Sequence, residues 1–131
     1  MAKNKRIAYK GFDKNLRCRE TQYTVGKTHT HAGAVVPCHS GLHACPEPID
    51  VLAYYYPGTS RFCVVEASGT VKVDDEKIAC KRLKVLRELS VSEFAKAAVE
   101  SRVRVLGRVY TTLAFFSEIA TIRYEMDSRA I

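Results

Sequence analysis

Hydrophobic and polar positions along the chain recur mostly in the short runs that are typical of β-strands. The clearest run is residues 61–67, and residues 70–73 continue the same pattern. Because Ser68-Gly69 separates the two runs, the pattern predicts a hairpin around this dipeptide. Shorter strand-like stretches occur at residues 7–9 and 16–25, where β-branched and aromatic residues are frequent. The first two thirds of the chain therefore predict a small sheet.

In the basic segment 77–89, which follows the acidic residues 74–76, the apolar positions change from even to odd numbers. Ile78 and Cys80 occupy even positions, whereas Leu83 and Val85 occupy odd ones. A straight strand cannot bury both sets on one face, because its side chains alternate between the two faces. We therefore expect a bulge or break near Lys81-Arg82.

A short helix is predicted near residues 48–56. Two prolines precede or begin it, where a missing amide hydrogen is tolerated, and Pro57-Gly58 ends it. Its apolar positions follow helical spacing and predict one buried face. They are Ile49, Leu52, Ala53 and Tyr56.

A longer helix is predicted near residues 91–105. Ser90 and Glu93 form the pattern of a capping box, and Leu89 and Phe94 are placed as a hydrophobic staple. Residues 109–126 fit either a strand or a second helix, and their length favours the helix. The expected fold is one α+β domain over residues 1–131, with a mainly antiparallel sheet and a C-terminal extension at 105–131.

Composition places the chain among ordinary globular proteins, with 47% hydrophobic and 27% charged residues in 131. No run of 18 apolar residues and no signal-peptide pattern occurs, so we expect a cytoplasmic protein that does not use a membrane. Five cysteines are an odd number. Without an export signal they are expected to be reduced thiols.

The net charge of +7 favours an anionic partner, which could be a nucleotide, a nucleic acid or an acidic protein surface. The basic residues concentrate in residues 3–19 and 77–87. Charge runs of this kind are equally compatible with strand faces that are simply solvated. The sequence predicts no cofactor and leaves the oligomeric state open.

Residues 38–45, CHSGLHAC, hold two of the four histidines and two of the five cysteines. A zinc site would use Cys38, His43 and Cys45, with Cys18 or His39 as a fourth ligand. The spacing is not that of a zinc knuckle, and a chain of this size folds without metal. Alternatively, the thiol of Cys45 precedes a helix, whose dipole would favour a thiolate nucleophile.

A small anionic ligand fits the pattern at least as well as a metal does. The start of the predicted helix near residues 48–56 offers free amides for a phosphate. Tyr54 and Tyr55 supply stacking surface, whereas Tyr56 is assigned to the core. The predicted ligand-binding residues are Lys10, Arg17, Arg19, His43, Tyr54, Tyr55, Lys81, Arg82 and Lys84.

Several motifs together resemble a family of small phage and prophage domains of unknown function. They are AYKGF at residues 8–12, the GLHAC motif within residues 38–45, DVLxYY at residues 50–55 and VVEAxG at residues 64–69. The resemblance covers roughly residues 6–100. The family often has Gly-Phe where this chain has Glu20-Thr21. The resemblance implies a phage origin and brings no established activity.

A weaker likeness is to ADP-ribosyltransferase-like folds. Gly41-Leu42-His43 would occupy the slot of their Gly-aromatic strand, Tyr54-Tyr55 that of a tyrosine near a helix end, and Glu66 that of an acid after an apolar strand. This chain departs from the pattern at His43, and the catalytic glutamate of such enzymes usually lies further along. Likeness at the level of fold does not transfer activity.

Three hypotheses follow from these observations. The first is a phage-type accessory protein, plausibly in counter-defence, that binds an anionic partner through a basic face without catalysis. The second is an enzyme that handles NAD or another nucleotide, with His43 and Glu66 as the catalytic candidates beside Tyr9, Lys10 and Tyr54. The third is a structural module without a ligand.

Overall fold

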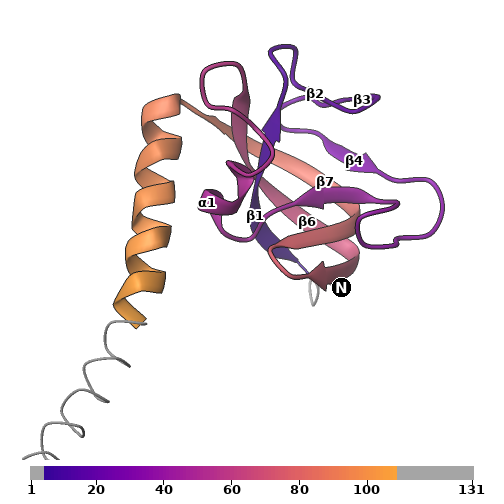
Figure 1. Ribbon diagram of the computed structural model, residues 1–131. Helices are drawn as coiled ribbons and strands as arrows, with labels where there is room; N and C mark the ends of the chain where they lie inside the picture. The colour runs from indigo at the N-terminus through magenta and orange to yellow at the C-terminus, as the bar shows by residue number, and fades with distance from the viewer. Residues whose placement is uncertain (1–4, 109–131) are drawn as a thin grey trace, which may run out of the picture. The chain divides into compact units, whose positions relative to one another are not determined.

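The computed structural model describes residues 5–108 of the chain (Figure 1). The chain divides into two compact units, residues 1–99 and residues 100–131. Of the second unit, residues 100–108 are described, and they are helical. The ambiguous segment 109–126 lies outside the described residues.

The first unit is an α+β fold with a mainly antiparallel sheet, as the sequence predicts. Within residues 5–108, one sheet has five strands and a second has two. A helix that covers residues 91–108 follows the last strand. The elements before it are β1 (Arg6–Phe12), β2 (Arg17–Cys18), β3 (Thr21–Gln22), β4 (Thr28–Thr30), β5 (Leu42–Ala44), α1 (Pro48–Val51), β6 (Arg61–Asp74) and β7 (Lys77–Leu89) (Figure 1).

The long β6–β7 hairpin is the centre of the large sheet, and it corrects one prediction. Strand β6 does not turn at Ser68-Gly69 but continues to Asp74, and the turn falls at Asp75-Glu76. Gly69 has a φ of +73°, which absorbs an irregularity in the ladder without reversing the chain. Asp75, with a φ of 51°, supplies the left-handed residue that the true turn needs.

The irregularity predicted near Lys81-Arg82 is present in the strand pairing, but β7 itself runs unbroken and the extra residue lies in β6. A register shift between Ser68 and Val71 of β6 lies opposite the segment from Arg82 to Cys80. Because of this shift, apolar residues of both parities reach the same core. They are Ile78, Cys80, Leu83 and Val85, all 0% exposed and in one cluster.

The remaining strands of the large sheet attach to the edges of this hairpin. Strand β1 pairs with β6, whereas β4 and β5 pair with two successive parts of β7. Strand β5 then returns toward β1, because the backbones of Tyr9 and Cys45 exchange two hydrogen bonds of 2.8 Å. The sheet therefore curls until segments on its two sides meet.

Helix α1 is shorter than predicted and buries a different face. It ends at Val51, and residues 52–54 form a turn, so helical spacing does not extend to Tyr56. Tyr56 is 73% exposed, which contradicts its assignment to the core. The buried residues of the helix are Pro48 and Val51, and the partly buried Tyr55 packs against the cluster that contains Val51.

The capping box at the start of the second helix is confirmed. The Glu93 amide donates to Ser90 Oγ at 3.0 Å, and the Ser90 amide donates to Glu93 Oε1 at 3.1 Å. Phe94, one residue later, stacks on Phe62 of β6 with ring centroids 4.0 Å apart. Leu89 belongs to the same buried cluster, as the hydrophobic staple requires.

Candidate functional site

A pocket of about 160 Å³ opens beside the Tyr9–Cys45 bridge. Residues of β1 and β5 both line it, and the bridge joins β1 to Cys45, the residue directly after β5. The β2–β3 hairpin and the turn after α1 supply further walls. The lining residues are Tyr9, Lys10, Gly11, Cys18, Arg19, Thr21, Tyr23, Cys38, Gly41, Leu42, His43, Ala44, Cys45, Val51, Tyr54, Tyr55 and Lys77.

Lys10 is the most deeply buried charged residue of the pocket, with 5% of its surface exposed. Its ammonium donates a hydrogen bond of 2.6 Å to the His43 carbonyl and so ties β1 to β5 through a side chain. The Nζ atom also lies 5.7 Å from the ring centroid of Phe12 and 5.5 Å from that of Tyr23. Burial lowers the pKa of Lys10, although the neighbouring Cys18 acts in the opposite direction.

His43 provides a polar atom that is not satisfied within the described part of the chain. Its Nε2 is buried and has no hydrogen-bond partner there. Burial lowers the pKa of His43, and the charges of Lys10, Arg19 and Lys77 lower it further. Burial and the three positive charges therefore all favour the neutral imidazole.

Arg19 and Lys77 bring positive charge to the pocket from two other elements. Arg19 is exposed in the loop between β2 and β3, and Lys77 begins β7. The Lys77 ammonium lies 3.8 Å from the ring centroid of Tyr54, whose hydroxyl donates to Glu76 Oε1 at 2.9 Å. Among the described residues, no aspartate or glutamate lines the pocket, although Glu76 and Asp74 hydrogen-bond to the lining residues Tyr54 and Cys38.

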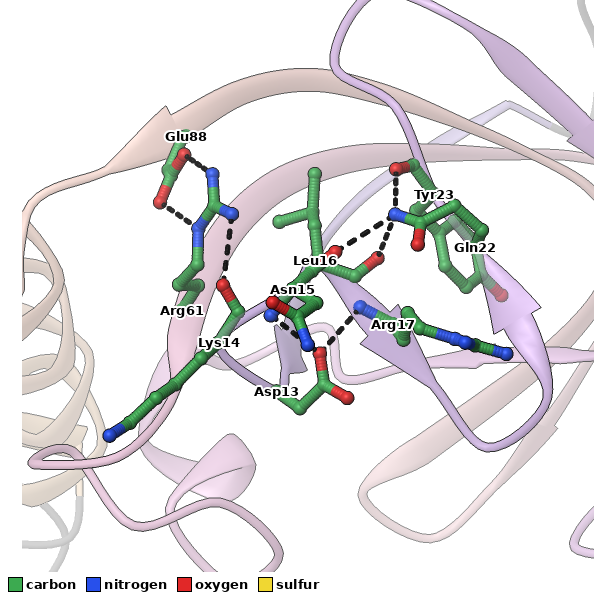
Figure 2. A network of polar contacts seen from close by, with 9 residues as sticks. All are labelled: Asp13, Lys14, Asn15, Leu16, Arg17, Gln22, Tyr23, Arg61 and Glu88. Atoms are coloured by element: carbon green, nitrogen blue, oxygen red, sulfur yellow. Dashed lines mark hydrogen bonds and ion pairs between the residues drawn. The ribbon is translucent and has the colours of Figure 1, made fainter.

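The hairpin that carries Cys18 and Arg19 is anchored by polar contacts at its base (Figure 2). Asp13 Oδ1 accepts hydrogen bonds of 2.8 Å from the amides of Asn15 and Arg17. Gln22 Nε2 contacts the carbonyls of Asn15, Leu16 and Tyr23 at 2.9, 3.3 and 3.0 Å. These bonds fix the loop conformation, including the positive φ of 60° at Leu16.

Tyr55 forms one wall of the pocket by lying directly on the backbone of β1. A Cβ atom at Gly11 would fall 2.4 Å from Tyr55 Cδ2, so the close approach requires glycine. The Tyr55 hydroxyl and Cys18 Sγ are 2.9 Å apart and hydrogen-bonded. Burial raises the pKa of Tyr55, so this wall stays uncharged at neutral pH.

The structure brings five of the predicted ligand-binding residues into this pocket: Lys10, Arg19, His43, Tyr54 and Tyr55. The other four do not line it. Arg17 is exposed in β2 and pairs through its backbone with Gln22. Arg82 and Lys84 lie in β7 opposite β4, and the preceding Lys81 donates to the Gly33 carbonyl at 2.8 Å.

Glu66 does not join His43 in the pocket. It lies in β6, paired with Ile7 of β1 and Lys84 of β7, and its carboxylate is 3.7 Å from Lys5 Nζ. Its neighbours Val65 and Ala67 belong to the interior cluster, which puts Glu66 on the opposite face of the strand. The acid and the histidine are therefore not arranged as one catalytic pair.

The cysteines do not form a metal centre in the part of the chain that is described. No group of three or more histidine, cysteine or acidic residues there is arranged to hold a metal ion. Cys38 donates to Asp74 Oδ2 at 3.2 Å and is exposed, whereas Cys45 is buried. Burial raises the pKa of Cys45 to about 11, which opposes the thiolate expected before a helix.

Sequence reasoning missed Lys77 as a pocket residue, and it considered Cys18 only as a metal ligand. Lys77 belongs to a basic run in which nothing distinguishes it from Lys81 or Lys84. The start of the strand at Lys77 was predicted, but the pairing of β7 with β5, which brings Lys77 to the pocket, was not. The hydrogen bond between Tyr55 and Cys18, which are 37 positions apart, helps to hold the β2–β3 hairpin at the pocket, and no local pattern reveals it.

The fold and the pocket define a small α+β domain with a basic, partly aromatic pocket at the edge of a curled sheet. The chain belongs to the family described as a domain of unknown function (DUF7666), whose model matches residues 6–97. Every lining residue of the pocket lies within that match. No curated protein and no solved structure matches the chain. Within residues 5–108, helices long and apolar enough to cross a bilayer are absent.

Proposed function

We propose that this domain is a binding protein, without catalytic activity of its own, that holds the anionic group of a ligand in the pocket around Lys10. One observation carries the proposal. Three cationic side chains from three elements, Lys10, Arg19 and Lys77, line a pocket in which the described residues place no carboxylate. Three cations with no carboxylate among the lining residues favour an anionic ligand, although Glu76 and Asp74 hydrogen-bond to two of those lining residues from outside the pocket.

The cations are graded in depth. Arg19 is exposed, Lys77 is half-buried and Lys10 is almost fully buried. An approaching anion would meet Arg19 first and Lys10 last. Interactions with the inner ammonium are stronger than those at the rim, because the surrounding protein screens charge less than water does. The neutral His43 adds Nε2, an atom that can bond to a hydroxyl or protonated oxygen of the ligand.

The volume of the pocket limits which part of a ligand enters. At about 160 Å³ it is smaller than the roughly 300–1,000 Å³ of pockets that enclose whole drug-sized molecules. A single phosphate or carboxylate group fits this space, and the rest of the ligand would remain outside it. Tyr54, 47% exposed beside the pocket, offers a ring surface to that outer part.

The phage resemblance extends the proposal to a biological role. A phage-type accessory protein that captures a phosphorylated host molecule, such as a signalling nucleotide, would act in counter-defence by lowering the free concentration of that molecule. A nucleotide combines the phosphate that suits the inner cations with a base that suits Tyr54. The sequence-based hypothesis assigned binding to a basic face of the protein, and the present proposal assigns it to the pocket around Lys10.

The test uses inorganic phosphate and adenosine 5′-monophosphate as probes of thermal unfolding. We expect both to raise the melting temperature of the wild-type domain, because a ligand that binds the folded state stabilises it. Arg19→Gln and Lys77→Gln should remove most of this shift. Lys84→Gln, which deletes an exposed cation outside the pocket, is the matched control and should keep it.

Two outcomes would overturn the proposal. A shift that Lys84→Gln abolishes and the pocket variants retain would assign binding to the β7 surface. No shift with either probe, together with no bound anion in native mass spectrometry of freshly purified protein, would show that the pocket is not an anion site.

A further inference from the structure

We propose that Lys10 is a carbonyl-reactive lysine, and that it forms a Schiff base with small aldehydes that carry a carboxylate or phosphate. The proposal rests on geometry: Lys10 lines an open pocket although only 5% of its surface is exposed, and its Nζ is held at 2.6 Å from the His43 carbonyl. It rests on the proposed function only for the anionic half of the ligand. The bond to the aldehyde is a separate property of Lys10.

Burial of Nζ favours the neutral amine that such chemistry needs, whereas the nearby thiols and the His43 carbonyl favour the ammonium. Burial lowers the pKa of Lys10, so a larger fraction of this amine is unprotonated near neutral pH than of an exposed lysine. A neutral amine that donates one hydrogen to the His43 carbonyl keeps its lone pair for a ligand. The other basic lining residues, Arg19 and Lys77, are placed to hold the anionic group.

The reaction balances without an added oxidant or reductant. The Nζ lone pair attacks the aldehyde carbon, a C–N bond forms, and the carbonyl oxygen takes a proton to give a carbinolamine. Loss of water then breaks the C–O bond and forms the C=N bond. The two hydrogens of the neutral amine leave with the carbonyl oxygen as that water.

The aromatic rings beside Nζ can stabilise the protonated Schiff base as well as the lysine ammonium. The ring centroids of Phe12 and Tyr23 lie 5.7 and 5.5 Å from Nζ, within the range of a cation–π interaction with a protonated imine. Both residues are buried, which restricts water around the C=N bond and slows its hydrolysis.

The experiment treats the full chain at neutral pH with glyoxylate, an aldehyde that carries a carboxylate, in the presence of cyanoborohydride. Acetaldehyde, which has no charge, is used in a parallel sample. Cyanoborohydride converts any Schiff base to a stable secondary amine, which peptide mapping by mass spectrometry locates. The exposed Lys14 and Lys84 serve as internal controls in the same molecule. Lys10→Arg provides a variant without a reactive amine at this position.

We expect Lys10 to be modified a few-fold faster than the exposed lysines with both reagents, because a larger fraction of its amine is neutral. Glyoxylate should be preferred over acetaldehyde at Lys10, and Arg19→Gln should reduce that preference. Modification of Lys14 and Lys84 while Lys10 stays unmodified would overturn the inference. The wild-type map decides this even if Lys10→Arg does not fold.

The results separate this inference from the proposed function. Rapid modification of Lys10 by acetaldehyde, with no preference for glyoxylate and no phosphate-induced shift, would support the reactive lysine and overturn the anion site. A phosphate-induced shift with an unmodified Lys10 would support the anion site and overturn the reactive lysine.

Discussion

The ring of Tyr55 lies on the backbone of Gly11 so closely that a methyl group there would fall 2.4 Å from Cδ2 and 2.5 Å from Cγ of the ring. We expect Gly11→Ala to displace Tyr55 and destabilise the domain by about 1–3 kcal/mol, the usual effect of forcing an extra carbon into a packed site. Urea unfolding followed by circular dichroism measures this loss. In a Tyr55→Ala background the same change should have little effect, and an undiminished loss there would contradict the contact.

The lowered pKa of Lys10 makes stability depend on pH. A lysine with a folded-state pKa below its ordinary value of 10.5 binds fewer protons when folded than when unfolded. Within the interval between the two pKa values, the free energy of unfolding therefore rises with pH. We look for this rise below pH 9, the ordinary cysteine pKa, because the buried thiols begin to titrate in the unfolded chain above it. It should be weaker in Lys10→Met, and an equal slope in the variant would exclude Lys10 as its source.

Asp74 controls the reactivity of the exposed Cys38. The thiol donates to Asp74 Oδ2 at 3.2 Å, and this hydrogen bond raises the pKa of Cys38. We expect Asp74→Asn to speed alkylation of Cys38 at pH 8 by a few-fold, because more thiolate is then present. The rate is measured with iodoacetamide and peptide mapping. Asp75→Asn, which removes a charge that contributes less, should give a smaller increase, and an equal one would contradict the role of the hydrogen bond.

Glu88 and Arg61 form a two-pronged ion pair between β7 and β6, with Nε–Oε2 and Nη2–Oε1 distances of 2.8 and 2.6 Å (Figure 2). The hydrogen bonds from Arg61 lower the pKa of Glu88. Stability from this pair is therefore present above the ordinary pKa of 4.5 and is lost as pH falls through the folded-state value. Glu88→Gln should lower the free energy of unfolding at pH 7 by about 0.5–1 kcal/mol, since both side chains are partly exposed. The difference in the free energy of unfolding between wild type and Glu88→Gln should disappear at low pH. A difference that persists there would not come from the ion pair.

Local patterns predicted the parts of the fold that depend on neighbouring residues. The Ser90–Glu93 capping box and the parity change around Lys81-Arg82 are each contained in a few positions. The capping box is confirmed, and the irregularity that the parity change predicts is present in the strand pairing. The hairpin at Ser68-Gly69 was wrong because a glycine inside a strand signals a bulge as readily as a turn. Tyr56 was misplaced because one turn of helix does not sustain the spacing that its neighbours suggested.

The candidate site was predictable only in part, because it is assembled from distant segments. Lys10 and His43 were chosen for their chemistry, and the structure joins them across 33 positions. Lys77 enters the pocket through strand register, which no local pattern reveals. Arg82 and Lys84, from the same basic run, instead lie opposite β4.

The strand order β1-β6-β7-β4 has a consequence for how the domain folds. Strands β6 and β7 are adjacent in the sequence and pair with each other. Strand β1 pairs with β6, which begins only at Arg61, and β5 pairs with β7, which begins only at Lys77. During synthesis from the ribosome, β1 and β5 therefore emerge before the surfaces that bury them exist. Distant pairing of this kind slows folding and leaves unpaired strands exposed. Variants that weaken the β6–β7 hairpin should accordingly reduce the yield of folded protein more than their equilibrium stabilities indicate.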